Sequence, residues 1–422
     1  MADIRFALRS AGQIPAAAPP PFSGAGCSPA TGDLLLCQPA ALQSRLRLRY
    51  SDEFGGVLVT PSSKTPRTWG GVPLARRRIL LGIAAVGGFL AVDFGAVAYA
   101  GGWIGTAHRL TPHIFIKAFE WVNGKQSGFR KNHAKGVAVA GYFESNGNGR
   151  EVSSAAVFRS GRTPVLGRFS LAGGDAHAAD TVSTARGLGL AFGFPGGAQW
   201  RTAMLNLPVF PDSSPQGFYD RLLASKPSPD TGKPDPKAMA AFLAEHPETA
   251  KAMKIIGQSP PTPGFADSTF RSLNTFYFIS ESGTRTPVRW SLVPVTPPPP
   301  RNSSGPNALF DALVRQIRSG PLQWTLMLTV GAPSDPLDDA TVPWPADRRA
   351  IDAGTLTLTS IETEHAGNAR DVNFDPLVLP PGIERSDDPL LSPRSAVYAA
   401  SYRVRAREPK SPPAVNVDEV AL

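Results

Sequence analysis

The stretch Phe129-Arg-Lys-Asn-His-Ala-Lys-Gly-Val-Ala-Val-Ala-Gly-Tyr-Phe143 decides how this chain is interpreted. From Val137 onward it is almost continuously apolar, which predicts a buried β-strand. His133 stands where this strand opens, and Arg130 precedes it by three residues. A histidine in that place is either a catalytic group or a structural residue, and composition alone leaves both interpretations open.

Further strands are predicted in 163–170, 188–194 and 274–279, where short apolar runs are separated by Gly, Asn or Pro. Helical periodicity is found chiefly in 215–225, 235–255 and 305–320. Strands therefore come first, then helices, then more strands. This order predicts an α+β fold with a mostly antiparallel sheet rather than a doubly wound parallel one.

The composition supports a folded domain. The 422 residues are 42% hydrophobic and 18% charged, which excludes a wholly disordered chain. With 43 Pro and 41 Gly the chain is rich in helix breakers, which argues against a coiled coil, a long helical bundle or a helical solenoid. The net charge is +9, but no basic run is interleaved with aromatic residues, so we expect no nucleic-acid partner.

Several kinds of site are excluded by the cysteines and histidines. Cys27 and Cys37 are the two cysteines, so the chain after them can form no Cys-ligated zinc site, iron–sulfur cluster or Cys nucleophile. None of the six histidines pairs with another at zinc-protease spacing. No Gly-x-Ser-x-Gly elbow, Walker loop or dinucleotide fingerprint stands out.

The N-terminal part has a different character. Residues 1–75 carry no long apolar stripe, so we expect a disordered leader. The basic triplet Arg76-Arg77-Arg78 then precedes an apolar stretch from Ile79 to Ile104, interrupted by Asp93. At about 1.5 Å of rise per residue this stretch can cross a hydrocarbon core of roughly 30 Å.

Three interpretations of the segment 76–104 compete: a buried core helix, a cleaved signal and an uncleaved membrane anchor. The sequence Ala98-Tyr99-Ala100 fits signal cleavage, whereas the length favours an anchor, which we prefer. The positive-inside rule places the arginines in the cytoplasm in either case. We therefore expect residues 105–410 to form an exported domain, membrane-anchored or, as the alternative, cleaved and soluble in the periplasm, with a tail at 411–422.

Arg130-x-x-His133-Ala-Lys-Gly followed by an apolar strand resembles the distal haem motif of the haem catalase family. Further matches follow in the family's order: Arg168-Phe-Ser, Asp180 before Arg186-Gly-Leu-Gly-Leu-Ala-Phe, the Phe374-Asp-Pro loop with its Pro-Pro-Gly, and Arg394-x-x-x-Tyr398. The resemblance covers about residues 115–408 and is strongest with the short, membrane-tethered catalase-related peroxidases. It implies a catalase-like antiparallel β-barrel with helical insertions and a C-terminal proximal helix.

On the proximal side, the resemblance implies that Tyr398 is the axial iron ligand of a haem b cofactor. At i, i+4 spacing on a helix, Arg394 and Tyr398 lie one above the other, so the guanidinium can hydrogen-bond the phenol oxygen. Both a cation and iron(III) favour the phenolate form of tyrosine. An anionic ligand supplies electron density to the iron and favours cleavage of the peroxide O–O bond.

On the distal side, the resemblance makes His133 the group that takes a proton from peroxide and returns it to the leaving oxygen, an effect worth about 10² to 10⁴ in rate. Ser170 matches the serine that orients this imidazole. The residues that match the family's cofactor contacts are Arg130, Arg168, Phe374 and Arg405. The resemblance implies that the three arginines face the haem propionates. Solvated surface charge is the alternative interpretation of each arginine.

One position departs from the family pattern, which has two consecutive asparagines before Thr-Pro, the first of them catalytic. Here the sequence is Leu205-Asn-Leu-Pro208, which places Leu205 at the catalytic position and Asn206 at the second. A slip of one residue would recover Asn206 as a catalytic candidate, but in a strand that slip turns the side chain to the other face. Loss of this donor predicts weak or no catalase activity.

The sequence thus predicts a haem peroxidase that reduces hydrogen peroxide or organic peroxides with an unidentified reductant. Two alternatives remain: a non-enzymatic haem-binding or storage protein, and a haem isomerase of lipid hydroperoxides. An oligomer is compatible with the sequence.

Overall fold

The computed structural model describes residues 110–181, 184–193, 197–297, 299 and 304–421. It also describes the backbone of a pair of short antiparallel strands, β1 (Thr68–Trp69) and β2 (Val72–Pro73). The rest of the expected leader and the membrane or signal segment expected at 76–104 lie outside the described residues. None of the helices in the described ranges combines the length and apolar character that crossing a membrane requires.

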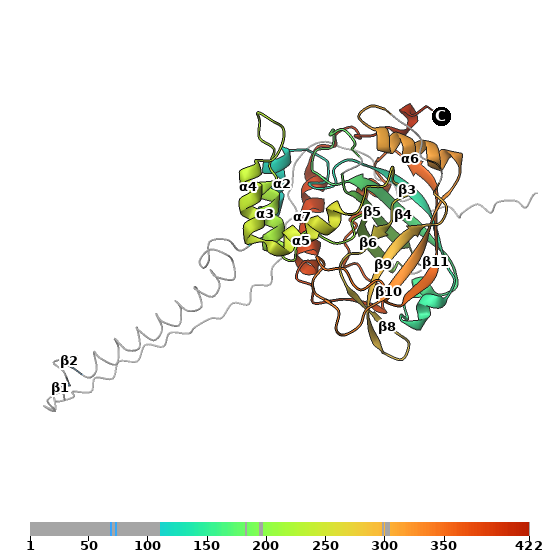
Figure 1. Cartoon of the computed structure of the whole chain (residues 1–422), viewed down its shortest axis with the longest axis horizontal. Helices are drawn as coiled ribbons and strands as arrows, with labels where there is room; N and C mark the ends of the chain where they lie inside the picture. Colours follow the sequence, from blue (N-terminus) through green and yellow to red (C-terminus); the bar gives the residue numbers. More distant parts are fainter. Residues whose placement is uncertain are drawn as a thin grey trace, which may run out of the picture. The chain divides into compact units, whose positions relative to one another are not determined.

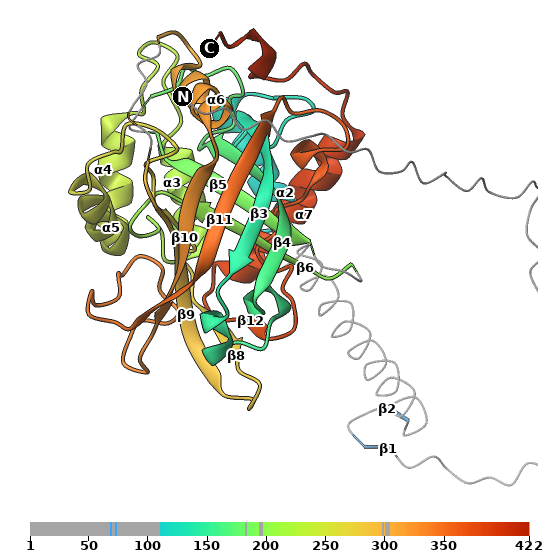
Figure 2. The ribbon, with the colours of Figure 1, turned by 90° about the vertical axis from the view of Figure 1, so that its right-hand side faces the viewer.

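An antiparallel β-barrel forms the centre of the domain (Figure 1, Figure 2). Its strands pair in the order β10-β11-β3-β4-β5-β6-β7-β9, and pairing of β9 with β10 closes the ring. Closure removes the unpaired edges that an open sheet would expose. β8 and β12 extend the sheet beyond β9. The bounds are β3 Gly136–Ser145, β4 Gly161–Leu171, β5 Arg186–Gly193, β6 Gln199–Leu205, β7 Phe270–Arg271, β8 Phe276–Ile279, β9 Arg285–Pro294, β10 Leu322–Val330, β11 Ala350–Glu362 and β12 Ile383–Arg385.

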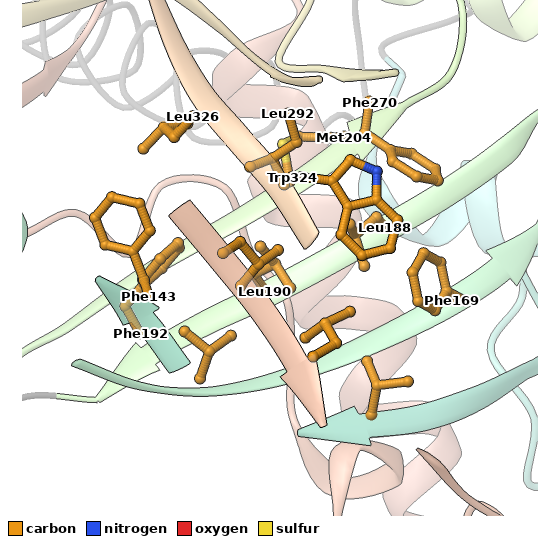
Figure 3. Close-up of a cluster of buried hydrophobic side chains, with 14 of the residues drawn as sticks. Phe143, Phe169, Leu188, Leu190, Phe192, Met204, Phe270, Leu292, Trp324 and Leu326 are labelled. Atoms are coloured by element: carbon orange, nitrogen blue, oxygen red, sulfur yellow. The ribbon is translucent and has the colours of Figure 1, made fainter. Parts of the chain in front are cut away.

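The barrel interior is dry and rich in aromatic side chains. Because side chains alternate along a strand, β4 turns Val165 and Phe169 inward, and β5 turns Leu188 and Phe192 inward. Figure 3 shows Phe169 and Leu188 near Trp324 of β10, and Phe192 beside Phe143 of β3. Trp324 is fully buried, and its indole nitrogen donates to the carbonyl of Ser268 over 3.1 Å. The burial of these large side chains is the main source of stability for the domain.

Helices α2 to α5 and α7 gather on one side of the barrel, whereas α6 lies across one end (Figure 1). Three of them begin with a capping residue followed by proline: Thr111, Ser214 and Asp235 each accept a hydrogen bond from a backbone N–H of the first turn. The bounds are α2 Pro112–Asn123, α3 Pro215–Ala224, α4 Pro236–Glu245, α5 Pro247–Gly257, α6 Ala308–Ser319 and α7 Leu391–Arg407.

The predicted α+β fold with an antiparallel sheet is confirmed, and the predicted strands correspond to β3, β4, β5 and β8. The helical periodicity predicted over 235–255 corresponds to two helices, α4 and α5, because Pro247 lacks the N–H that would continue the first helix. Residues beyond 410, expected to be a tail, pack on the domain: Val417 is buried, and Arg318 donates to its carbonyl over 2.9 Å.

Candidate functional site

Strand register brings the sequence-predicted residues together on the outer face of the barrel. Gly136 of β3 pairs with Ser170 of β4, Ser170 pairs with Gly187 of β5, and Gly187 pairs with Leu205 of β6. These four residues therefore form a row across four strands, at the N-terminal end of β3, three residues after His133. The side chains of Ser170 and Leu205 point away from the apolar interior, because they alternate with the inward residues Phe169 and Met204.

The backbone of His133 is held in an uncommon conformation, with φ at 54°. This left-handed region is unfavourable for a residue with a Cβ atom, so neighbouring contacts must hold it. Arg168 supplies them, donating from one guanidinium nitrogen to the carbonyl of His133 over 2.8 Å and from another to the carbonyl of Ala134 over 3.0 Å. The His133 N–H donates to the side-chain oxygen of Asn132 over 3.0 Å.

The ring of His133 is oriented from the same strand. Its Nδ1 lies 3.1 Å from the hydroxyl oxygen of Ser170, two residues after Arg168. Burial, followed by the positive charges of three arginines, lowers the pKa of His133 from its ordinary value of 6.5 to about 3. The imidazole is therefore neutral at neutral pH and able to accept a proton. The three arginines are Arg168, Arg394 and Arg130.

A cavity of about 320 Å³ separates this wall of the barrel from helix α7. Its volume lies in the range of small-ligand pockets. The predicted site residues in its lining are Arg130, His133, Arg168, Ser170, Phe374, Arg394 and Tyr398. Most of the remaining lining is apolar, with Phe115 and Phe119 from α2 and Phe218 from α3. Residues that are far apart in the sequence thus converge on one enclosed space.

Helix α7 supplies another part of the cavity lining. Arg394 and Tyr398 lie one turn apart, and the guanidinium carbon of Arg394 is 5.7 Å from the centroid of the Tyr398 ring. Arg394 therefore lies over the ring and does not make the predicted hydrogen bond to the phenol oxygen. Its guanidinium donates instead to the side chain of Asn274 over 2.9 Å and to the carbonyl of Ala203 over 2.8 Å. Asn274 in turn donates to buried Asp388 over 2.8 Å.

The three remaining arginines surround one buried carboxylate. Glu364 accepts two hydrogen bonds from Arg168, each of 2.8 Å. Burial alone raises the pKa of Glu364, but the charges of Arg168, Arg130 and Arg405 outweigh it, so the net direction is downward. Burial, and then its arginine neighbours, hold the pKa of Arg130 well below its usual range. This cluster has a strong excess of positive charge.

Arg168 and Arg405, both predicted to face haem propionates, make different contacts in the structure. Arg168 gives its donors to Glu364 and two backbone carbonyls, so it positions protein groups. Arg405 lies outside the lining of the main cavity but lines a small adjoining cavity with Arg130 and Arg168. Its Nε and Nη2 atoms are buried and find no hydrogen-bond partner within the described residues. These atoms are suited to receive an anionic group.

Asn206 does not face the cavity, whereas Leu205 and Leu207 line it. The side-chain oxygen of Asn206 accepts from the backbone N–H of Arg186 over 2.7 Å, which joins the end of β6 to the start of β5. Asn206 is therefore a strand-pairing residue in this structure, and the slip that would make it catalytic does not occur. The reason is the register of β5 and β6, in which Gly187 pairs with Leu205.

The sequence did not indicate that Glu364, Asn274 and Asp388 belong to the site. Each is a single polar residue without a motif around it, and each meets its arginine or amide partner only in the fold. One signal was available: several arginines predicted at one site require a carboxylate nearby, since buried positive charges must be compensated. That signal calls for an acidic residue but does not say which one.

We expect Gly187→Ala to disturb the position of the His133 ring. A Cβ atom at this position would lie 2.7 Å from the Ser170 hydroxyl and 3.1 Å from the His133 ring, so one of them must move. Overpacking of this kind costs about 1 to 3 kcal/mol in the free energy of unfolding. Urea denaturation would measure that loss, and NMR of the imidazole would report a shifted His133 resonance.

Gly193→Ala is the matched control. Gly193 lies on the same strand as Gly187, but its added Cβ would meet no atom closer than 3.9 Å. It should leave the His133 resonance unchanged. Equal spectra for Gly187→Ala and wild type would contradict the close packing described for Ser170 and His133.

Comparison with known sequences agrees with this geometry. The model of the Catalase family matches residues 109–411. A catalase-related peroxidase of Synechococcus elongatus is 38% identical over 307 residues, covering 71% of this chain and 90% of that protein. A catalase-related peroxidase of Mycolicibacterium paratuberculosis is 30% identical over 313 residues, covering 72% of this chain and 98% of that protein. The catalase of Rattus norvegicus is 28% identical and is covered over 55% of its length.

Solved structures share the fold. A fungal catalase superposes with a TM-score of 0.59 at 22% identity, covering 72% of this chain and 64% of that one. Catalase A from Saccharomyces cerevisiae gives a TM-score of 0.58 at 24% identity, covering 69% and 64%. The chain thus spans less than two thirds of these solved catalases. Since the family model spans most of the described domain and the two catalase-related peroxidases are matched over at least 90% of their length, this chain belongs to the catalase family.

Proposed function

We propose that this protein is a haem b-dependent peroxidase that reduces hydrogen peroxide or small organic hydroperoxides and has weak catalase activity. The observation that carries the proposal is one cavity lined by both neutral His133 and Tyr398. Membership of the catalase family implies a haem cofactor. The catalase-related peroxidases similar to this chain support the peroxidase assignment.

The residues around the cavity fit a haem. Arg405 has two buried guanidinium nitrogens without partners among the described residues, and Arg130 lies in the same cluster, so two propionates would compensate this charge. Phe374, which also lines the cavity, is held close to the barrel wall, because a Cβ at Gly189 would come within 2.8 Å of its ring.

In this assignment each side chain has a defined task. When bound, haem supplies the iron at which the peroxide O–O bond is broken. Tyr398 would bind the haem iron through its phenol oxygen, and Arg394 holds a positive charge over the Tyr398 ring. Ser170 fixes Nδ1 of His133, which leaves Nε2 to take a proton from the peroxide and return it to the leaving oxygen. The low pKa of His133 keeps its imidazole ring neutral at neutral pH.

The decisive experiment compares purified full-length wild type, His133→Ala and Tyr398→Phe after loading with haem. Wild type should show a Soret band and turn over cumene hydroperoxide with a dye as reductant. His133→Ala should keep the band but lose about 10²-fold or more in turnover, because the proton carrier is gone. Tyr398→Phe should shift the band and retain less haem, because the proximal ligand is lost.

His177→Ala is the control, since His177 is exposed and lies outside the cavity lining. It should behave as wild type. Unchanged turnover in His133→Ala would overturn the assigned mechanism. A normal Soret band in wild type with no peroxide consumption would favour a haem-binding or storage protein instead, and product formation without any reductant would favour an isomerase.

Leu205 should be the reason that catalase activity is weak. Its apolar side chain lines the cavity on the barrel wall and offers no hydrogen-bond donor to a second peroxide. Leu205→Asn, a change of similar size, should raise oxygen release from hydrogen peroxide at least several-fold, as an oxygen electrode would measure. Leu205→Ala, which removes bulk without adding a donor, should not. Equal oxygen release in all three proteins would refute this account.

We further propose that the domain is exported, either tethered by the apolar segment 79–104 or released after its cleavage. The support is the arginine triplet before that segment and the small residues Ala98 and Ala100 near its end. Cell fractionation followed by N-terminal sequencing would test this. An intact chain in the cytoplasmic fraction would contradict export, and a new N-terminus near residue 101 would favour the cleaved form.

A further inference from the structure

Tyr402 connects the cavity to the protein surface. It lies on α7 one turn beyond Tyr398, and both side chains line the cavity. Four helical residues correspond to about 6 Å along the axis, so the two rings are close neighbours. Tyr402 is nevertheless 37% exposed to solvent. Every other residue that lines the cavity is buried or only partly exposed, so Tyr402 is the lining residue best placed to meet molecules from outside.

Few residues of the cavity wall can lose an electron readily. Among the described residues that line it, the oxidisable tyrosine and methionine side chains are Met204, Tyr398 and Tyr402. Met204 is 2% exposed, and Tyr398 is assigned to the iron. Tyr402 is thus the oxidisable side chain of this wall that a reductant in solution can touch.

The charge around Tyr402 determines how it would be oxidised. The guanidinium carbon of Arg405 lies 5.2 Å from the centroid of the Tyr402 ring. A positive charge at this distance opposes formation of a radical cation, so an electron must leave together with the phenolic proton. Because the side chain is exposed, water can accept that proton.

We propose that Tyr402 is the site at which the external reductant delivers electrons, and this proposal rests on the peroxidase function proposed above. Reduction of a hydroperoxide to an alcohol and water consumes two electrons and two protons. In each of two steps, Tyr402 gives one electron to the oxidised cofactor and one proton to water, and becomes a neutral phenoxyl radical. A phenol or hydroquinone then donates a hydrogen atom and restores tyrosine. The sum is ROOH + 2 AH₂ → ROH + H₂O + 2 AH•.

A sequential stopped-flow experiment on haem-loaded full-length protein tests the proposal. Cumene hydroperoxide is mixed first and hydroquinone second, and the Soret absorbance is followed. In Tyr402→Phe the Soret absorbance should change at the wild-type rate when peroxide is added. Its recovery after hydroquinone is added should be at least tenfold slower than in wild type. Tyr402→Trp, which restores an oxidisable ring, should recover much of the return rate.

Tyr277→Phe is the matched control. Tyr277 also has a guanidinium over its ring, that of Arg285 at 3.3 Å, but it lies on β8 outside the cavity lining. It should match wild type in both phases. Haem content and the urea midpoint, measured for every variant, show whether each one is folded.

A second readout does not depend on turnover. Wild type treated with peroxide and a spin trap in the absence of reductant should carry the adduct on Tyr402, which tandem mass spectrometry can distinguish from Tyr398 within the tryptic peptide 395–403. Tyr402→Phe should lose that adduct and the tyrosyl signal in electron paramagnetic resonance.

The outcomes separate the two proposals. If peroxide leaves the wild-type Soret band unchanged, the peroxidase function fails and the role of Tyr402 fails with it. If wild type responds but Tyr402→Phe returns at the wild-type rate, or the trapped adduct lies on another residue, the role of Tyr402 alone is overturned.

Discussion

The geometry of the site depends on the contacts made by the buried guanidinium of Arg168. It binds the carbonyls of His133 and Ala134 and receives its counter-charge from Glu364. These bonds hold His133 in a left-handed conformation that it would not adopt alone. Two residues further along the same strand face, Ser170 fixes the imidazole. One strand therefore sets both the backbone and the ring of the proposed catalytic base.

The two faces of the barrel have opposite properties, and both follow from the alternation of side chains along its strands. Inward positions carry large apolar residues such as Phe169 and Leu188, which exclude water and stabilise the ring. Outward positions at the same strand ends carry Ser170 and Gly187, which leave space for a cavity. Helix α7 contributes Tyr398 to the lining of the same cavity, so the cavity lies between barrel strands and a helix.

Local patterns predicted much of this arrangement. The apolar run after His133 predicts β3, and the i, i+4 spacing of Arg394 and Tyr398 predicts their neighbouring positions on α7, because both depend on residues close in the sequence. The partners of the arginines could not be predicted. Arg168 meets Glu364 across 196 residues and Arg394 meets Asn274 across 120, and no local pattern encodes such a pairing.

Sequence alone predicted the candidate reacting groups, most of the strands and helices that carry them, and the family to which the chain belongs. Tertiary structure decided which groups face the cavity. Leu205 and Asn206 are adjacent, and a strand turns adjacent residues to opposite faces, so the sequence could not assign the cavity position between them. The pairing of Gly187 with Leu205 settles it, because register is a relation between strands and not a property of either one.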